Sequence, residues 1–268
     1  MAGKYLNFSE VLSYGWSVMK ANFWFFVGLG FVWLIITISP DIAELTLIPL
    51  LFLHKASYIT LYITLRVLLL VIELVIGIVL SIGLLKIALS FCDEQKPGIG
   101  TLFDVWDCFW RYVGTTILFG LIMSGIIVPC ALAPRLLRAT HFPYLLPLII
   151  LFVIVIVFAV RFGIQFGLCY YFVIDKGLGP VQALKASSRT TMGVKWQLLG
   201  FGILCGLINL LGLLCLVVGV FAAYPTVLVA SALVYRQLLA QTPELAEFGI
   251  VIPSPEPDTA PLPNEQEF

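Results

Sequence analysis

A run of forty residues without a charged side chain separates Lys195 from Arg236. At a rise of about 1.5 Å per residue, a helix of this length would measure about 60 Å, roughly twice the hydrocarbon thickness of a bilayer. Other long apolar runs precede it in the sequence. We therefore expect a chain that crosses a membrane several times.

The balance of residue types supports the same conclusion. Hydrophobic residues make up 61% of the 268 residues and charged residues only 11%, which is too apolar for a single water-soluble domain. The net charge is zero, so no long-range field favours nucleic acid as a partner. The six cysteines are single and lie mostly in apolar runs, so we expect them to pack as small hydrophobic side chains.

The apolar runs predict an all-α fold, a polytopic membrane helical bundle with about six transmembrane helices. Runs of about 20 mostly apolar residues are typical of such helices. The segments that we assign are 22–39, 67–90, 113–133, 144–174, 195–208 and 213–236. The fourth is long enough to tilt or to protrude from the membrane.

Residues that disturb helices set the expected ends of these segments. We expect Pro40 to end the first crossing and Pro225 to kink the last one. Segment 45–65 is apolar but is interrupted by one proline and two polar residues. This pattern favours a non-crossing segment at the outer interface, with a re-entrant hairpin as the alternative. The last two helices are expected to meet in a turn at 209–212, where Asn and Gly occur.

The distribution of basic residues predicts the orientation. With six crossings and the N-terminus inside, ten basic residues lie near inner ends: Lys4, Lys20, Lys86, Lys96, Arg111, Lys176, Lys185, Arg189, Lys195 and Arg236. The outer side has four: Lys55, Arg66, Arg135 and Arg138. This asymmetry favours both termini in the cytoplasm.

The composition changes abruptly after Thr242. Segment 243–268 contains six prolines and several acidic residues, which predicts a disordered, Pro-rich, acidic cytoplasmic tail behind a helical transmembrane domain, 1–242. Two interpretations of the tail stay open. It could dock on a cytosolic partner, or it could only increase solubility.

A similar order of segments occurs three times, over about 9–91, 101–174 and 180–240. In each copy, a short segment with regularly spaced polar residues leads through an aromatic and basic junction into a pair of membrane helices. The polar positions are Glu10, Ser13, Ser17 and Lys20; Asp104, Asp107 and Arg111; and Gln182, Lys185 and Arg189. We therefore predict three pseudo-repeats, each led by an amphipathic interfacial helix that either binds lipid or packs as a collar under the bundle.

The last third of the chain carries a resemblance to a known family. Its motifs are short and mostly apolar, at 179–187, 196–200, 219–225 and 235–238. The pattern resembles bacterial polytopic inner-membrane proteins of the YciC type, and is similar to the membrane domain fused to some glycerophosphodiester phosphodiesterases. The resemblance implies a six-helix fold in the bacterial cytoplasmic membrane, in a group that largely lacks an assigned biochemical role. The phosphodiesterase barrel is missing here, so no catalytic residue is carried over.

Two charged residues lie deep inside predicted crossings, far from the ends. Glu73 and Arg161 are seventeen and thirteen residues from the inner ends of their helices, so an ion pair between them is geometrically possible. A buried carboxylate in a membrane is costly unless it is paired or protonated. The pair could serve as a proton or ion relay or line a headgroup cavity. Alternatively, it could fix the register of two helices, or Arg161 could reach the interface.

The sequence offers no set of residues for catalysis or metal binding. The two histidines, His54 and His141, have no second His, Cys or carboxylate at ligand spacing, so we expect no metal site and no cofactor. The expected function is a non-catalytic one, in which the chain organises the envelope as a scaffold or interacts with membrane lipids. The alternative is a transporter for a small molecule, an ion or a lipid. The oligomeric state is left open.

Overall fold

The computed structural model describes residues 6–47, 56–93, 95, 97–138, 145–242 and 245. The regular structure within these ranges is entirely helical, which confirms the predicted all-α class. The elements are α1 (Phe8–Ala21), α2 (Phe23–Leu47), α4 (Ala56–Cys92), η1 (Ile99–Leu102), α5 (Trp106–Arg138), α6 (Leu145–Phe166), α7 (Cys169–Lys176), α8 (Pro180–Thr190), α9 (Lys195–Leu214) and α10 (Leu216–Ala240).

Five described segments are long and apolar enough to cross a membrane: Phe23–Pro40, Tyr58–Cys92, Ile149–Lys176, Lys195–Leu214 and Gly219–Ala240. They coincide with five of the six predicted crossings, and the remaining one, 113–133, falls inside α5. The chain is therefore a multi-pass membrane protein with a helical bundle fold.

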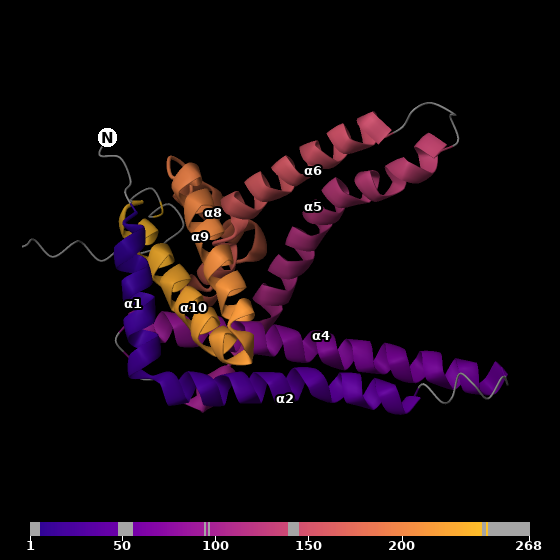
Figure 1. The fold of residues 1–268 in the computed structure, drawn as a ribbon, viewed down its shortest axis with the longest axis horizontal. Helices are drawn as coiled ribbons and strands as arrows, with labels where there is room; N and C mark the ends of the chain where they lie inside the picture. Colours follow the sequence, from indigo (N-terminus) through magenta and orange to yellow (C-terminus); the bar gives the residue numbers. More distant parts are fainter. Residues whose placement is uncertain are drawn as a thin grey trace, which may run out of the picture.

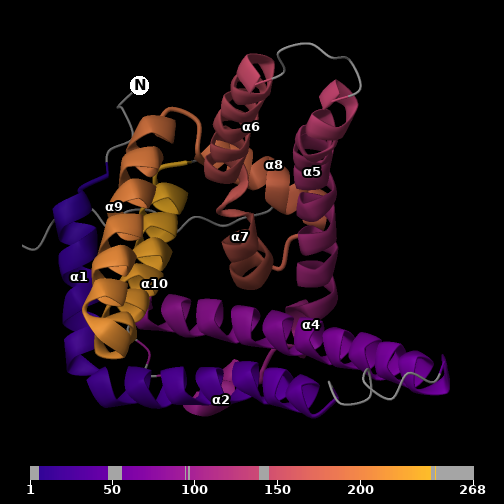
Figure 2. The same ribbon diagram turned by 45° about the vertical axis from the view of Figure 1, so that its right-hand side comes forward.

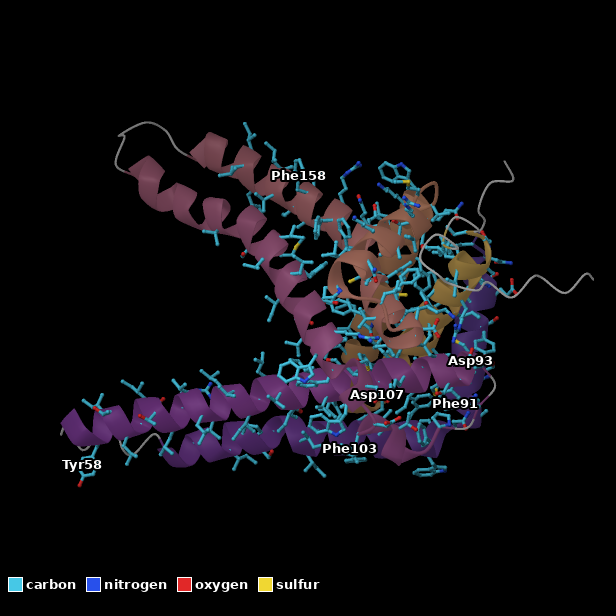
Figure 3. All side chains as sticks on the ribbon, turned by 180° about the vertical axis from the view of Figure 1, so that it is seen from behind. Tyr58, Phe91, Asp93, Phe103, Asp107 and Phe158 are labelled. Carbon is cyan, nitrogen blue, oxygen red and sulfur yellow. The ribbon has the colours of Figure 1, made fainter. Side chains whose placement is uncertain are left out.

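The buried side chains gather at one end of the molecule, which we call the hub. It consists of α1, α7 and α8, together with three further segments: residues 80–91 of α4, residues 102–112 around the start of α5, and residues 229–239 of α10. From the hub, the pairs α2–α4 and α5–α6 extend in different directions (Figures 1 and 2). Figure 3 shows this contrast along α4, where Phe91 and Asp93 lie among other helices and Tyr58 lies at the far end.

The extended parts expose many large apolar side chains. No residue in the most apolar window of Ile149–Lys176 is buried within the protein. Surface of this kind is unfavourable in water and is matched by lipid hydrocarbon. The hub, in contrast, packs as a conventional core around Tyr235, Phe172 and Ile82.

The first candidate span ends at Pro40 as predicted, but the helix does not, because α2 continues through Pro40 to Leu47. Proline has no N–H to donate to the carbonyl four residues earlier. In α2, the hydroxyl of Ser39 donates to the carbonyl oxygen of Ile36 at 3.1 Å. This bond replaces the missing one, as Ser and Thr do in membrane helices.

Segment 45–65 is not a separate interfacial segment in its described parts. Residues up to Leu47 belong to α2, and residues from Ala56 belong to α4; the predicted interruption falls on 48–55, outside the described residues. The predicted second crossing, 67–90, is therefore part of a longer helix of 37 residues.

The predicted fourth crossing, 144–174, is divided in two. The described helix α6 ends at Phe166 and α7 begins at Cys169. A Cβ atom on Gly167 would lie 2.7 Å from the carbonyl oxygen of Gly163. Glycine therefore fits best at this break between α6 and α7. At its other end α7 stops at Gly177, whose φ of 60° favours glycine.

The turn predicted at 209–212 was placed too early. Asn209 lies within α9, where its side-chain amide donates to the carbonyl oxygen of Cys205 at 3.0 Å. The helix ends instead at Leu214, with Cys215 as its C-cap. Gly212 serves close packing, since a Cβ atom there would lie 2.7 Å from the Cβ of Ala223 on α10.

The threefold repeat stays a prediction. The first helix of each predicted copy is not the same in the three copies. In the first and third copies, the polar segments form the separate helices α1 and α8. In the second copy, Asp107 and Arg111 belong to the first turns of α5, which continues without a break into the apolar part. The break after α8 includes Gly193, with φ of 88°, and α5 has no comparable residue at its junction.

The predicted tail, 243–268, lies outside the described residues except for Leu245. This side chain is fully buried in the hub. The folded part of the chain therefore extends at least to this position.

Candidate functional sites: a polar cavity and an apolar groove

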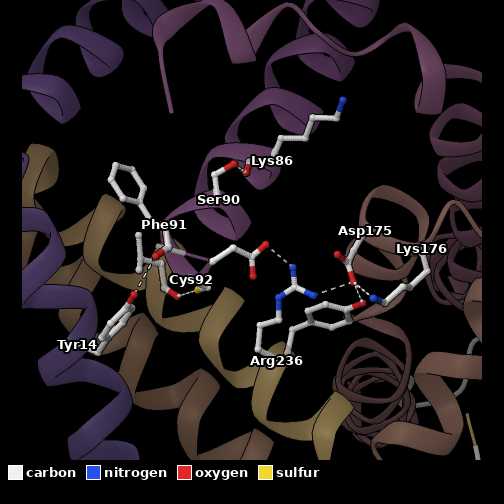
Figure 4. A network of polar contacts seen from close by, with 11 residues as sticks. Tyr14, Lys86, Ser90, Phe91, Cys92, Asp175, Lys176 and Arg236 are labelled. Atoms are coloured by element: carbon white, nitrogen blue, oxygen red, sulfur yellow. Dashed lines mark hydrogen bonds and ion pairs between the residues drawn. The ribbon is translucent and has the colours of Figure 1, made fainter. Parts of the chain in front are cut away.

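Arg236 is the only charged residue between Trp196 and Thr242. Its Nη1 donates to Asp175 Oδ2 at 3.0 Å, and its Nη2 donates to Asp93 Oδ2 at 2.7 Å (Figure 4). We call Asp93, Asp175 and Arg236 the clasp. Because Asp93 follows α4, Asp175 lies at the end of α7 and Arg236 lies on α10, the clasp joins three parts of the chain that are far apart in sequence.

Two neighbours complete the surroundings of Asp175, whose side chain is only 12% exposed. The hydroxyl of Tyr235 donates to Asp175 Oδ2 at 2.9 Å, and Lys176 Nζ lies 3.2 Å from the same oxygen. This one carboxylate oxygen therefore meets three donor groups, two of which are cationic.

A polar cavity of about 420 Å³ lies beside the clasp. Lys86 on its wall donates to the backbone carbonyl of Asp104, and its Nζ lies 3.5 Å from Asp104 Oδ2. Among the described residues, Arg236 Nε is buried and has no acceptor. The wall consists of Lys86, Leu89, Ser90, Asp93, Gln95, Pro97, Gly98, Thr101, Asp104, Ile174, Asp175 and Arg236.

The chemistry of this cavity is that of paired charges. Within the described parts of the chain, no three His, Cys, Asp or Glu side chains are placed to hold a metal ion, and both histidines lie outside those parts. Burial raises the pKa of the nearby Cys108 thiol, so this cysteine stays protonated and unreactive at neutral pH. The ion pairs of the clasp are suited to hold three helix ends together.

Glu73 and Arg161, the predicted intramembrane pair, have different surroundings. Arg66 Nη1 donates to Glu73 Oε1 at 3.1 Å, and both side chains belong to α4. Arg161 is exposed on α6, and no ion pair with it is found in the described ranges. Because α4 and α6 diverge (Figure 2), the observed partner of Glu73 is two turns away on its own helix.

An apolar groove lies between α2 and α10, within two candidate membrane spans. Its volume is about 400 Å³, which is in the range of ligand pockets. Gly30 lets the ring of Phe221 pack closely against α2, because a Cβ atom at this position would collide with that ring. The groove is lined by Phe26, Leu29, Gly30, Trp33, Leu34, Leu84, Leu213, Val220, Phe221, Tyr224, Pro225 and Leu228.

All six tryptophans of the chain are exposed. Five of them lie near the ends of apolar segments: Trp16, Trp24, Trp106, Trp110 and Trp196. Tryptophan is favourable at the headgroup level of a bilayer, where its ring is half in hydrocarbon and its N–H can bond to polar groups. These positions are the ones expected at membrane boundaries.

Comparison with known proteins finds no relative of this chain. No family model, no curated protein sequence and no solved structure matches this chain. The resemblance to the YciC type therefore rests on the residues that suggest it.

Sequence reasoning did not find the clasp or the groove. The signal was the isolation of Arg236, the single charge in a span of more than forty residues. The groove has no sequence signal, because its lining residues come from four helices.

Proposed function

We propose that this chain is a non-catalytic membrane protein that binds membrane lipid, and that the apolar groove between α2 and α10 holds an acyl chain. The groove is the observation that carries the proposal. It lies between Phe23–Pro40 and Gly219–Ala240, at the depth where hydrocarbon chains are the surrounding solvent. An acyl chain in the groove contacts protein on several sides, so it makes more dispersion contacts than it would in bulk lipid.

The distribution of exposed side chains also supports a lipid-interacting role. Apolar residues cover the extended helices and tryptophans lie at their ends. We further propose that the protein resides in the bacterial cytoplasmic membrane with both termini inside. The excess of Lys and Arg at the predicted inner ends supports this orientation.

Filling the groove is expected to displace bound lipid. Val220 is part of the groove wall, and Val220→Trp places an indole in the space of an acyl chain. Overlap in a packed site costs about 1–3 kcal/mol, so lipid occupancy should fall about fivefold or more. The measurement is native mass spectrometry of the purified protein, counting retained phospholipid.

The matched control is Val153→Trp, the same exchange at an exposed position of α6 outside the groove. It should retain lipid as the wild type does. Equal lipid retention in both variants, with both proteins monodisperse, would contradict the proposed site.

A further inference from the structure

Helix α8 connects two candidate membrane spans. Ile149–Lys176 ends just before it, and Lys195–Leu214 begins just after it. The helix therefore lies at a membrane boundary, between the end of one span and the start of the next. Segment 176–242 contains five Lys or Arg residues and no Asp or Glu.

One face of α8 is buried and the other is exposed. The buried face consists of Ala183, Leu184, Ala186, Ser187 and Thr190. On the exposed side, Val181 is 56% exposed and Lys185 is also exposed; the turn that follows the helix exposes Met192 to 55%.

The next helix continues this surface with Trp196, which is 84% exposed. We call Val181, Lys185, Met192, Lys195 and Trp196 the α8 patch. Large apolar side chains beside cations are typical of helices that lie in the headgroup region of a membrane.

Polar bonds to one residue, Gln165 at the end of α6, fix the orientation of α8. The hydroxyl of Ser187 donates to the carbonyl oxygen of Gln165 at 2.9 Å. The side-chain amide of Gln165 donates to Ser188 Oγ at 2.8 Å, and its Oε1 accepts a bond from Lys195 Nζ at 3.3 Å. Rotation of α8 would break these bonds, so the exposed face is held outward.

The charges around α8 favour an anionic ligand. Arg111 donates to the carbonyl oxygen of Gly177, which places a further cation near the start of α8. Asp175 is occupied by Lys176, Tyr235 and Arg236. Two exposed carboxylates, Asp104 and Asp107, lie near the start of α5.

We infer that the α8 patch binds the headgroups of anionic phospholipids, with Lys185 and Lys195 near the phosphates and Val181, Met192 and Trp196 at the acyl boundary. The inference rests on the proposed lipid-binding function and adds the class of lipid. A basic side chain near an anionic membrane surface is attracted to it, and salt screens this attraction.

The test uses the fluorescence of Trp196 in nanodiscs. The full chain is reconstituted in phosphatidylcholine that contains either brominated phosphatidylglycerol or brominated phosphatidylcholine at the same mole fraction. The signal of Trp196 is obtained by subtracting the quenching measured for Trp196→Phe. We expect the anionic quencher to be more effective, and Lys185→Gln to lower its local enrichment about fivefold.

Lys20→Gln, which removes an exposed cation on α1, is the matched control and should leave the quenching of Trp196 unchanged. Equal quenching by the two lipids would overturn the selection of anionic headgroups while leaving lipid contact in place. Absence of quenching by either lipid would overturn the α8 patch as a lipid surface. The lipid-binding function itself is judged separately, by lipid retention in Val220→Trp.

Discussion

Replacing Arg236 by Met is expected to lower the free energy of unfolding by about 3 kcal/mol, the low end for a buried ion pair that loses one partner. The guanidinium bonds to both Asp93 and Asp175, so its removal leaves two carboxylates that face each other across the clasp. The low end applies because the three side chains stay partly exposed. The melting temperature in detergent should fall by about 10 °C.

Arg236→Lys should restore only part of the stability, because a single ammonium does not reproduce the planar fork of Arg. Lys20→Met, at an exposed position on α1, serves as the control and should change the melting temperature by about 2 °C or less. If Arg236→Met and Lys20→Met had the same melting temperature, the clasp would not stabilise the hub.

The second large effect is expected from Gly83→Ala. A Cβ atom at this position would lie 2.5 Å from the carbonyl oxygen of Leu102 and 2.7 Å from its Cα. These are backbone atoms of η1, so no side-chain rotation relieves the clash, and α4 and η1 must separate. Overpacking of this kind costs about 1–3 kcal/mol, and thermal unfolding measures it.

Gly77→Ala is the matched control, since both glycines belong to α4 and a Cβ atom at Gly77 has open space around it. Alanine is the better helix former, so this variant should be as stable as the wild type or more stable. An unchanged melting temperature for Gly83→Ala would show that α4 and η1 are not in close contact.

The membrane class could be predicted from the sequence because hydropathy is summed over some twenty residues, so single exceptions matter little. Each predicted crossing falls largely within one described helix or within the pair α6–α7. The ends were less predictable because each depends on one local bond. Ser39 keeps α2 intact at Pro40, and Asn209 bonds within its own helix.

The candidate sites were beyond prediction because they depend on contacts between distant parts of the chain. The two bonds of Arg236 span 61 and 143 residues. The sequence suggests Arg161 on another helix as a partner for Glu73, whereas Arg66, one of the outer basic residues, pairs with Glu73 within α4. Charge counting assigned Arg66 to the outer side of the membrane, but it could not pair Arg66 with Glu73.

The most direct test of lipid binding in the groove is cross-linking with a phospholipid that carries a photoactivatable diazirine in its acyl chain. After irradiation in nanodiscs, mass spectrometry of the digested protein locates the adducts. We expect them to concentrate on groove residues of α2 and α10, above the level on α6, whose most apolar window is not buried and reports bulk lipid. Adducts spread over α2, α10 and α6 in proportion to their exposed surface would contradict a lipid site in the groove.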